Sequence, residues 1–555
     1  MKRIKTLTFI EFLIAVILLS VALFQTKGYF LTSFESKYVT YAISSNSFFD
    51  ILKSVFYGIN VFENSPVYLL ITKFFTAISG SSSEFIVRLP VMIISFLTTV
   101  FLYFFLNNYT NKKYAVITTL TFALNISFLT FSSVSIPQIM AADFTMLAVL
   151  FGFVPLLPQD TPNKHLYFAG FWVITFIVIY TDLFTGILPL LIVGLSYIIL
   201  GQTKKLLNLI NIILCIFSVF LIMHNWQLVS YKVAESIPVF DTFFVDGRLN
   251  IPSYIFLKYF TGLFIGLLPW TVIFFVITAN SLFNGSLIQK INIKDFSNEK
   301  RFLTVSLIGF FITSFVFFLN HSVTDIILAV SFSSFYIAYF WHQYIAEEKF
   351  KPAFNFASSF FFVTTLLVAV TSIFIYFFFD NSVKGYIEPL LNPLITITLL
   401  VSVPGLIVLM LDKRWYVFFA HLMFSLTFYF MLTGVLFDYL NSFGESELIT
   451  YAADAKNNVK TLATYDLKNK YVLPYYFGNI VEFNDKPSPE EFFEKYGNSY
   501  DARVITKIKN LEDFDKYFVY EILGTGKIYC VITNIKKIPE LPEDNTQDKE
   551  EREII

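Results

Sequence analysis

Residues 81–113 read SSSEFIVRLPVMIISFLTTVFLYFFLNNYTNKK. Charges are confined to the two ends of this segment, Glu84 and Arg88 at one and Lys112 and Lys113 at the other. The apolar stretch between them has about 20 residues, the length that a helix needs to cross a bilayer. Similar stretches recur along the 555 residues, of which 56% are hydrophobic and 15% charged, whereas a soluble domain has about 25% charged residues. The sequence therefore predicts a polytopic α-helical membrane protein.

About 13 stretches are long and apolar enough to be transmembrane helices. We predict them near residues 7–25, 87–107, 114–133, 139–157, 166–182, 184–200, 206–224, 255–279, 302–320, 323–343, 355–379, 391–411 and 416–440. One further stretch, 66–79, has only about 14 residues and carries Lys73 in its middle. We expect it to form an interfacial helix that does not cross.

The distribution of basic residues predicts the sidedness of these spans. If 66–79 does not cross, the cytoplasmic side receives MKRIK at the N-terminus and the loops NNYTNKK, LPQDTPNKH, GQTKK, QKINIKDFSNEKR, AEEKFK and LDKRW. These hold most basic residues of the membrane part, as cytoplasmic loops do. The N-terminus is then inside and the C-terminus outside. A signal peptide is the alternative for the first stretch, but no small-residue cleavage site follows it, so we expect an uncleaved span.

The membrane domain is predicted to comprise residues 1–443, with a first outside loop at 26–86 and a long outside loop at 225–254. A small α+β domain follows outside the membrane at 444–540, and the acidic end, 541–555, is expected to be disordered. Within the α+β domain we predict strands in KTLATYD, YVLPYYFG, ARVITKI, KYFVYEIL and KIYCVITNI, a hairpin turn at LGTGK and a helix in PSPEEFFEKYG.

Charge, cysteine content and hydropathy pattern disfavour several classes of protein. The net charge of −1 argues against a nucleic-acid partner. Cys215 lies in an apolar span and Cys530 in the polar tail, so no disulfide framework is implied. The hydropathy pattern has no internal repeat and no pair of broken spans in matching positions, which disfavours a transporter.

Charged residues on the predicted outer face are the candidates for chemistry, because a charge in or near a span is costly. A carboxylate can act as a base on an acceptor hydroxyl or hold a metal ion. Arg and Lys can hold a phosphate group. The candidates are Glu35, Lys37, Asp50, Lys53, Glu63, Glu84, Arg88, Asp143, Asp182, Glu235, Asp241, Asp246, Arg248, His321 and Asp325.

Each candidate also has a structural interpretation, and both interpretations are open on these grounds. An acid in the first turn helps a helix to start, which accounts for Glu63. A long basic side chain at the end of a span can extend to the interface, which accounts for Arg88. The other structural interpretations are a solvated helix end for Glu35 and Lys37, helix caps for Asp143 and Asp182, and turn positions for His321 and Asp325.

A series of motifs runs in a distinctive order. After the first span come FESKY, ENSPVYLL, GSSSEFIVRLPVMI, an Asp at the start of a later span, YTDLFTGILPLL, RLNIPSYIFLKYFTGLFIGLLPW and the polar tail. This order resembles glycosyltransferase family 39 in the broad sense, which contains the bacterial aminoarabinose transferases that act on lipid A and the protein O-mannosyltransferases. The resemblance implies the GT-C membrane fold and sugar donors carried on polyprenyl phosphate, used on the non-cytoplasmic face.

Residue by residue, the resemblance places the family's first-loop acidic pair on Phe34 and Glu35 and the following basic residue on Lys37. The family's Glu-Lys-Pro-Pro stretch falls on Glu63–Pro66. In that stretch the Glu is associated with a divalent metal in some members and the Lys with the lipid phosphate. Two further positions match, Asp143 for a second family Asp and Arg248 for a basic residue in the long outside loop.

The sequence departs from the family pattern at four places. The first Asp of the pair, the family's catalytic carboxylate, is Phe34, and the phosphate-binding Lys is Asn64. The family's Thr-Lys-Gly reads Thr181-Asp182-Leu183, and its late Lys-x-x-x-Tyr turn reads Ser322-Val323-Thr324-Asp325. A phenyl ring neither accepts a proton nor binds a metal, so either another carboxylate takes this role or the reaction is lost.

Two functions are therefore expected for a multi-pass protein of the cell inner membrane. The first is transfer of a hexosyl or pentosyl group from a polyprenyl-phosphate donor to a lipid, glycan or protein acceptor. The second is a catalytically degenerate relative that acts as a membrane binding or assembly subunit. In the transferase, the expected catalytic residues are Glu35 and Asp143, the donor-phosphate ligands Lys37, Arg88 and Arg248, and the ligand of a divalent metal, where one is used, Glu63.

Overall fold

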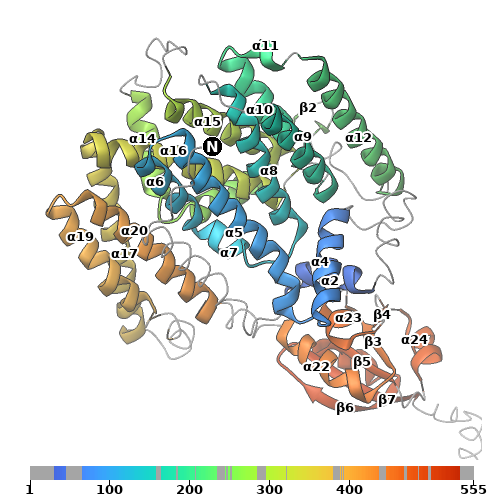
Figure 1. Ribbon diagram of the computed structural model, residues 1–555. Coiled ribbons are helices and arrows are strands. Elements are labelled where there is room, and N and C mark those ends of the chain that lie inside the picture. Colours follow the sequence, from blue (N-terminus) through green and yellow to red (C-terminus); the bar gives the residue numbers. More distant parts are fainter. Residues whose placement is uncertain are drawn as a thin grey trace, which may run out of the picture. The chain divides into compact units, whose positions relative to one another are not determined.

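The computed structural model describes residues 31–44, 65–157, 164–182, 185–206, 208–233, 244–245, 248–249, 253–283, 296–320, 322–378, 388, 391, 393–436, 445–467, 472–479, 481–484, 487–497 and 502–537. The chain divides into two compact units (Figure 1). The first contains Tyr41–Leu436, and the second joins Phe30–Thr40 to Phe437–Ile555. Helix α2 (Ser33–Ser44) passes from the second unit into the first.

The described part of the first unit is almost entirely helical. Its α-helices are α4 (Pro66–Ser79), α5 (Glu84–Tyr109), α6 (Lys112–Ala123), α7 (Ile126–Phe131), α8 (Pro137–Phe153), α9 (Lys164–Thr181), α10 (Leu188–Ile199), α11 (Thr203–Leu206), α12 (Leu209–Val233), α13 (Ser253–Gly266), α14 (Thr271–Phe283), α15 (Asn298–Asn320), α16 (Val323–Glu347), α17 (Lys351–Phe378), α19 (Val403–Met410) and α20 (Arg414–Met431). Short elements between them are η1 (Val154–Leu156), η2 (Thr185–Ile187), the paired strands β1 (Phe244–Val245) and β2 (Arg248–Leu249), η4 (Thr398–Ser402) and η5 (Leu432–Leu436).

Eight helices of the described part are long and apolar enough to cross a membrane, and each matches a predicted span. They are Glu84–Tyr109, Pro137–Leu156, Lys164–Thr181, Asn298–Phe318, Thr324–Glu347, Lys351–Phe378, Pro393–Met410 and Arg414–Gly434. A ninth is formed by Ile255–Gly266 and Thr271–Phe283 if this bent pair is one span. The prediction of a polytopic α-helical membrane protein is confirmed, while the number of about 13 transmembrane helices stays a prediction.

The other predicted stretches have different outcomes. Those at 66–79, 184–200 and 206–224 contain the shorter apolar helices Pro66–Ser79, Thr185–Ile199 and Ile210–Met223. The stretch at 7–25 lies outside the described residues.

The stretch at 114–133 is broken at Asn125, which divides it into α6 and α7, and its crossing of the membrane stays a prediction. The Asn125 Nδ2 group donates to the carbonyl of Phe122 at 2.6 Å, and its Oδ1 accepts the Phe128 amide at 2.7 Å. One side chain therefore satisfies groups that the end of α6 and the start of α7 would leave free. Asn125 is fully buried, and Nδ2 also donates to Ser334 Oγ of α16 at 3.2 Å.

A second break, between α13 and α14, meets the first. The two helices differ in direction by 106°. In the bend, the carbonyl of Leu268 accepts the amide of Ile126, the first residue of α7, at 3.2 Å. Gly266 permits this approach, because a Cβ atom there would clash with Ser127 Oγ and lie 3.0 Å from Val330 Cγ2. Both breaks are thus covered by protein, as irregular backbone at membrane depth must be.

Loops predicted on the cytoplasmic side contact one another. The side chain of Asn298, at the start of α15, donates to the carbonyl of Tyr109 at 2.7 Å. Nearby, Asn111 Nδ2 donates to Glu299 Oε1 at 3.3 Å. These bonds join the α5–α6 turn to the start of α15, so the two predicted cytoplasmic loops lie at the same end of the unit.

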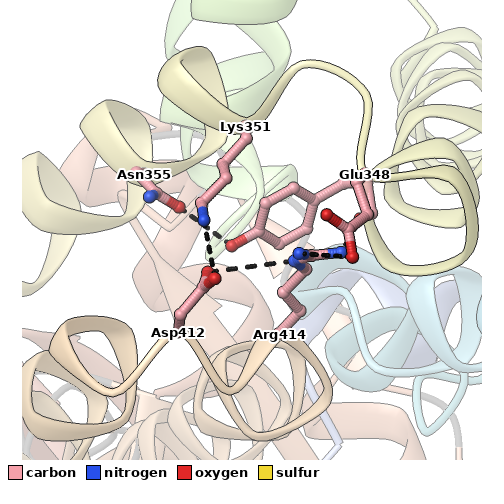
Figure 2. A network of polar contacts seen from close by, with 6 residues as sticks. Glu348, Lys351, Asn355, Asp412 and Arg414 are labelled. Carbon is pink, nitrogen blue, oxygen red and sulfur yellow. Dashed lines mark hydrogen bonds and ion pairs between the residues drawn. The ribbon is translucent and has the colours of Figure 1, made fainter.

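A second polar network joins the α16–α17 turn to the α19–α20 turn (Figure 2). Asp412 lies between two cations, with Lys351 Nζ 2.6 Å from Oδ2 and Arg414 Nε 3.8 Å from Oδ1. Arg414 also pairs with Glu348 at 2.9 Å. Each partly exposed ion pair contributes little to the free energy of unfolding. The network is therefore useful mainly because it shows that the two turns lie next to each other. Both lie at one end of their helices, as their predicted common side requires.

The second unit contains a five-stranded mixed sheet with helices on its two faces (Figure 1). The strand order is β4 (Val481–Asn484), β3 (Thr461–Tyr465), β5 (Ala502–Lys507), β7 (Tyr529–Lys537) and β6 (Phe518–Thr525), with β3 parallel to β4 and β5, and β7 antiparallel to β5 and β6. The helices are α22 (Glu445–Asn458), α23 (Val472–Phe477), α24 (Pro489–Tyr496) and α25 (Leu511–Phe514), with η6 (Ile508–Asn510) before the last.

Period-two alternation along the strands builds a core on each face of this sheet. One core gathers residues of α22 and α23 with Leu462, Ile505 and Val531. The other gathers residues of α24 and α25 with the adjacent strand positions Ala463, Val504 and Ile532. The strand predictions in KTLATYD, ARVITKI, KYFVYEIL and KIYCVITNI are confirmed, as is the helix in PSPEEFFEKYG.

The strand predicted in YVLPYYFG is wrong, because Val472–Phe477 forms helix α23. A short apolar run does not distinguish a strand from a buried helix, and Pro474 sits in the first turn, where a helix tolerates proline. Strand β4 was not predicted. Its four residues, VEFN, alternate between apolar and polar, but the strand is short and lies at the edge of the sheet.

The β6–β7 hairpin is held by a carboxylate from α22. Glu447 accepts the amides of Lys527, Ile528 and Tyr529 at 2.6, 3.2 and 3.1 Å. Gly526 makes room for it, since a Cβ atom there would collide with the Glu447 carboxylate. The hairpin turn predicted at LGTGK is therefore fixed both by its own glycine and by an acid about 80 residues earlier in the chain.

We expect Gly266→Ala to lower the thermal unfolding midpoint of the detergent-purified protein, because the added methyl group overpacks the contact between α13 and α7. The free energy of unfolding is expected to fall by about 1–3 kcal/mol. Gly194→Ala is the matched control, since Gly194 has open space around its Cβ position. Equal midpoints for the two variants would contradict the role given to Gly266.

We expect Glu447→Ala to destabilise the second unit by about 1–2 kcal/mol, because three amides lose a charged acceptor. The readout is labelling of Cys530 by maleimide. Cys530 is buried, so the reagent reaches it only when the second unit opens. Burial also raises the pKa of its thiol to about 11, which slows the reaction in the folded state. In a Cys215→Ser background, the labelling rate should rise about 5- to 30-fold. The exposed Glu494→Ala is the control and should label like the parent.

Candidate functional site

A hydrogen-bonded chain of three buried residues brings two predicted site motifs together. The Tyr68 hydroxyl, in the first turn of α4, donates to the carbonyl of Ser135 at 2.8 Å and lies 2.8 Å from its hydroxyl. Ser135 Oγ in turn donates to the carbonyl of Val87 at 2.5 Å. The segment that follows Glu63, the start of α5 and the turn before α8 therefore meet. Arg88 adjoins this meeting point.

Arg88 is enclosed by protein. Only 6% of it is exposed, although it lies in the second turn of α5, near the predicted outer end of the span. A snorkelling side chain would extend away from the protein to the interface, so this interpretation does not fit. A buried guanidinium is retained where it has polar or anionic partners. Arg88 is thus suited to hold an anionic group within the fold.

Asp143 is buried within α8 and bonds to a neighbouring helix. The N-cap position of α8 is Ile136 and the helix begins at Pro137, so Asp143 lies in its second turn and does not cap it. The hydroxyl of Ser95, on α5, donates to Asp143 Oδ2 at 2.5 Å. A carboxylate at this depth in a span is costly, and a single hydroxyl leaves acceptor capacity on it for a further donor.

The Asp143 carboxylate lines a small cavity. Its walls are formed by Ser95, Phe122, Phe128, Phe131, Ser132, Ile139, Ala142, Asp143, Met146, Ile327 and Ser331. The empty space is about 280 Å³ including its mouth. Its interior accommodates about one water-sized group, so a single acceptor hydroxyl would fit beside the carboxylate. Its lining combines aromatic rings with one carboxylate and three serine hydroxyls.

The face of α5 relates Arg88 to this cavity. Arg88 and Ser95 are seven residues apart and so lie on one face of the helix, about 10.5 Å apart along its axis. Ser95 holds Asp143. Buried Arg88 and the Ser95 that bonds the buried Asp143 carboxylate therefore lie along one side of α5.

Asp182 accepts hydrogen bonds from two threonines, one of which lies at the start of α16. Asp182 Oδ2 accepts the hydroxyl of Thr185 at 2.7 Å and that of Thr324, from a distant part of the chain, at 3.3 Å. Asp182 thus ties η2 to α16 as well as ending α9. Asp325 lies in the first turn of α16 and is fully buried, so it is a helix residue and not part of a turn as expected. His321 lies outside the described residues.

Glu35 closes the start of α2 in the second unit. Its Oε2 accepts the Thr32 amide at 3.0 Å and the Thr32 hydroxyl at 3.2 Å. Its own amide donates back to Thr32 Oγ1 at 3.2 Å. This reciprocal arrangement is a capping box, which the sequence TSFE encodes. Glu35 therefore has a structural function in α2, and its catalytic role stays a prediction.

The other predicted site residues are described in part or not at all. Lys37 Nζ lies 5.5 Å from the ring centre of Tyr38 on α2, within the range of a cation–π contact. The backbone of Arg248 is in β2, paired with Val245, and its side chain lies outside the described part. Glu63 also lies outside it. Among the described residues, no group of three His, Cys, Asp or Glu side chains is arranged to hold a metal ion.

The uncharged members of the site were not predicted, namely Tyr68, Ser95, Ser132, Ser135 and Ser331. Charge was the criterion for candidate residues, and serine is common in membrane helices. A signal was nevertheless present for Ser95, which lies two helical turns from Arg88 in an otherwise apolar span.

Comparisons with known proteins give a family match for part of the chain and a fold match for most of it. Residues 63–226 match the family described as dolichyl-phosphate-mannose-protein mannosyltransferase. The segment contains Tyr68, Arg88, Ser95, Ser135 and Asp143. None of the curated proteins matches the chain in sequence.

Two crystal structures of ArnT from Cupriavidus metallidurans share the fold. The apo structure has a TM-score of 0.69 and the structure bound to undecaprenyl phosphate 0.67, each at 14% identity, with 94% of this chain and 97% of the other covered. At this identity the likeness establishes the fold. The chain therefore has the GT-C-like membrane fold of ArnT, and the match over residues 63–226 confirms the resemblance to the mannosyltransferase family that the motif order predicts.

Proposed function

We propose that this protein is a membrane glycosyltransferase that moves a sugar from a polyprenyl-phosphate donor to a hydroxyl of a lipid, glycan or protein acceptor. One observation carries the proposal: the buried Asp143 carboxylate faces a cavity and is bonded to Ser95, on the face of α5 that also carries buried Arg88. The fold adds support, because ArnT, which shares it, has been crystallised with undecaprenyl phosphate.

Asp143 is assigned the acceptor side of the reaction. An acceptor hydroxyl that enters the cavity would donate to the carboxylate oxygen, which takes its proton as the hydroxyl oxygen bonds to C1 of the sugar. The bond between C1 and the phosphate oxygen breaks, and its electron pair leaves with the polyprenyl phosphate. Ser95 holds Asp143 Oδ2 and so restricts how the carboxylate can turn.

Arg88 is assigned the donor side. The departing phosphate gains negative charge in the transition state, and a preorganised cation in a site that excludes water stabilises such charge strongly. Its guanidinium can hold two phosphate oxygens at once. The carbonyl of its neighbour Val87 accepts the Ser135 hydroxyl, which anchors this turn of α5 to the start of α8.

Metal participation stays a prediction that rests on Glu63 alone, and no step of this proposal uses a metal. The degenerate alternative, a binding or assembly subunit, draws support from Phe34 and from the capping function of Glu35. The two proposals differ in whether Asp143 is needed for transfer.

We further propose a multi-pass position in the cell inner membrane with the N-terminus and the Figure 2 network in the cytoplasm and the second unit outside. This proposal is supported by the basic residues Lys349, Lys351, Lys413 and Arg414 in two turns at one end of the helices.

We expect Asp143→Asn to lower sugar transfer in the parent cell about 10²- to 10⁴-fold, because the amide cannot take up the acceptor proton. The measurement is the amount of glycan or modified lipid in cells that carry only the variant gene. Asp412→Asn, which alters an exposed carboxylate of the same unit, is the control and should retain transfer. Transfer within twofold of the parent in Asp143→Asn would exclude Asp143 as the base and favour the assembly subunit.

Sidedness can be tested with two exposed positions in a Cys215→Ser background. In intact spheroplasts a membrane-impermeant maleimide should label Ser81→Cys, whereas Lys413→Cys should react only after permeabilisation. Buried Cys530 contributes little background. The reverse pattern would invert the proposed topology.

A further inference from the structure

Two aromatic walls of the Asp143 cavity are bonded to Asn125, a fully buried residue that is not itself part of the lining. The Asn125 Nδ2 group donates to the carbonyl of Phe122, and Oδ1 accepts the amide of Phe128. The rings of Phe122 and Phe128 are in contact, with their centres 4.4 Å apart. Because both rings line the cavity, the bonds made by Asn125 fix two of its walls.

The same amide group is bonded to the helix that forms another wall. Asn125 Nδ2 also donates to Ser334 Oγ at 3.2 Å. Ser334 lies three residues after Ser331 and seven after Ile327, so the three residues share one face of α16. Ser331 and Ile327 both line the cavity. Asn125 therefore connects the aromatic walls to the α16 wall, whereas the Asp143 carboxylate belongs to α8.

These bonds go beyond what a helix cap requires. A cap for α7 needs one acceptor for the Phe128 amide, which Ser, Thr or Asp would supply as well. Asn125 adds two donors, and both are used, one on Phe122 and one on Ser334 of a third helix. No donor is left for a substrate, so Asn125 can act on the reaction only through the residues that it holds.

We infer that Asn125 is a positioning residue for sugar transfer, which sets the aromatic and α16 walls of the cavity relative to the Asp143 carboxylate. The interior accommodates about one water-sized group, so a small shift of these walls would displace an acceptor hydroxyl from the carboxylate. A misplacement of about 1 Å can cost roughly 10²-fold in rate. The inference rests on the proposed function, because it names the residue that determines how the acceptor meets the proposed base.

The first test compares Asn125→Ala with Asn111→Ala. Asn111 caps the start of α6, where its Oδ1 accepts the Tyr114 amide at 2.8 Å. Both variants lose a helix cap and should lower the thermal unfolding midpoint of the purified protein. Transfer in the parent cell, relative to the amount of protein, should fall about 10- to 100-fold in Asn125→Ala and stay within about twofold in Asn111→Ala. Equal losses of transfer in the two variants would overturn the inference.

Asn125→Ser separates positioning from capping. Serine is a good N-cap residue, so the start of α7 should keep its partner and the unfolding midpoint should recover toward that of the parent. A hydroxyl has one donor, so it cannot serve both Phe122 and Ser334. Transfer should therefore stay about fivefold or more below the parent. Recovery of transfer in parallel with the midpoint would show that stability alone matters and would overturn the positioning role.

If the Asn125 variants do not accumulate in the membrane, Ser334→Ala tests the inference with both caps intact. The matched control is Ser306→Ala on α15. The Ser306 hydroxyl is buried and donates to the carbonyl of Phe302 at 2.8 Å, as that of Ser334 donates to Val330 at 2.9 Å. Transfer should fall about 3- to 10-fold in Ser334→Ala only, the effect of one neutral hydrogen bond. The same transfer in both variants would contradict the role of Asn125.

A thiol in the cavity wall gives a readout that does not depend on transfer. Ser331→Cys is introduced in a Cys215→Ser background, where buried Cys530 contributes little, and the purified protein reacts with methyl methanethiosulfonate. Adding Asn125→Ala should raise the reaction rate about 3- to 10-fold, because the walls lose the bonds that hold them, and adding Asn111→Ala should not. An unchanged rate in Asn125→Ala overturns the inference.

The outcomes separate this inference from the proposed function. Full transfer in Asn125→Ala while Asp143→Asn is inactive overturns the positioning role and leaves the catalytic site in place. Full transfer in Asp143→Asn overturns the catalytic site, and the thiol at position 331 then still decides whether Asn125 holds the cavity walls.

Discussion

A helix that ends inside a membrane must provide partners for its free amides and carbonyls, because lipid provides none. In this protein Asn125 meets that requirement at the α6–α7 break, with its amide group serving Phe122 and its carbonyl oxygen serving Phe128. The carbonyl of Leu268 in the second bend completes the start of α7. The cavity depends on this arrangement, because α7 and the turn after it supply Phe128, Phe131 and Ser132 to its walls.

The two predicted catalytic carboxylates have different surroundings. Asp143 faces a cavity and receives one serine hydroxyl, so acceptor capacity remains on the carboxylate. The Glu35 carboxylate bonds to the start of its own helix, where Oε2 accepts hydrogen bonds from the amide and the hydroxyl of Thr32. Phe34 stands where the resemblance to glycosyltransferase family 39 places a catalytic Asp. These features shift the proposed acid–base role from the first loop to Asp143.

Much of the fold was predictable because long apolar stretches and period-two strands are local patterns. Eight predicted spans and four predicted strands are present. The features that were not predicted have a common physical cause, since each depends on a distant partner. The sequence of residues 114–133 does not indicate that Asn125 bonds to Ser334 or that the amide of Ile126 bonds to the carbonyl of Leu268. Similarly, α23 is a helix because its apolar side packs on the sheet. Arg88 and Asp143 could be nominated from their charge, whereas their relation through Ser95 required the packing of α5 against α8.

Helix α2, which passes from the second unit into the first, is bonded at its start to the C-terminal part of the chain, because the Leu31 amide donates to the Tyr476 hydroxyl of α23 at 2.9 Å, across 445 positions. At a synthesis rate of roughly 5–20 residues per second, Tyr476 emerges about 20–90 s after Leu31. During that interval the membrane helices between them are made, while the start of α2 lacks its last partner. A chain interrupted before α23 would carry the Asp143 cavity but not the hydroxyl that bonds the start of α2. The order of translation therefore makes the Tyr476 bond to the start of α2 a mark of a chain synthesised beyond α23.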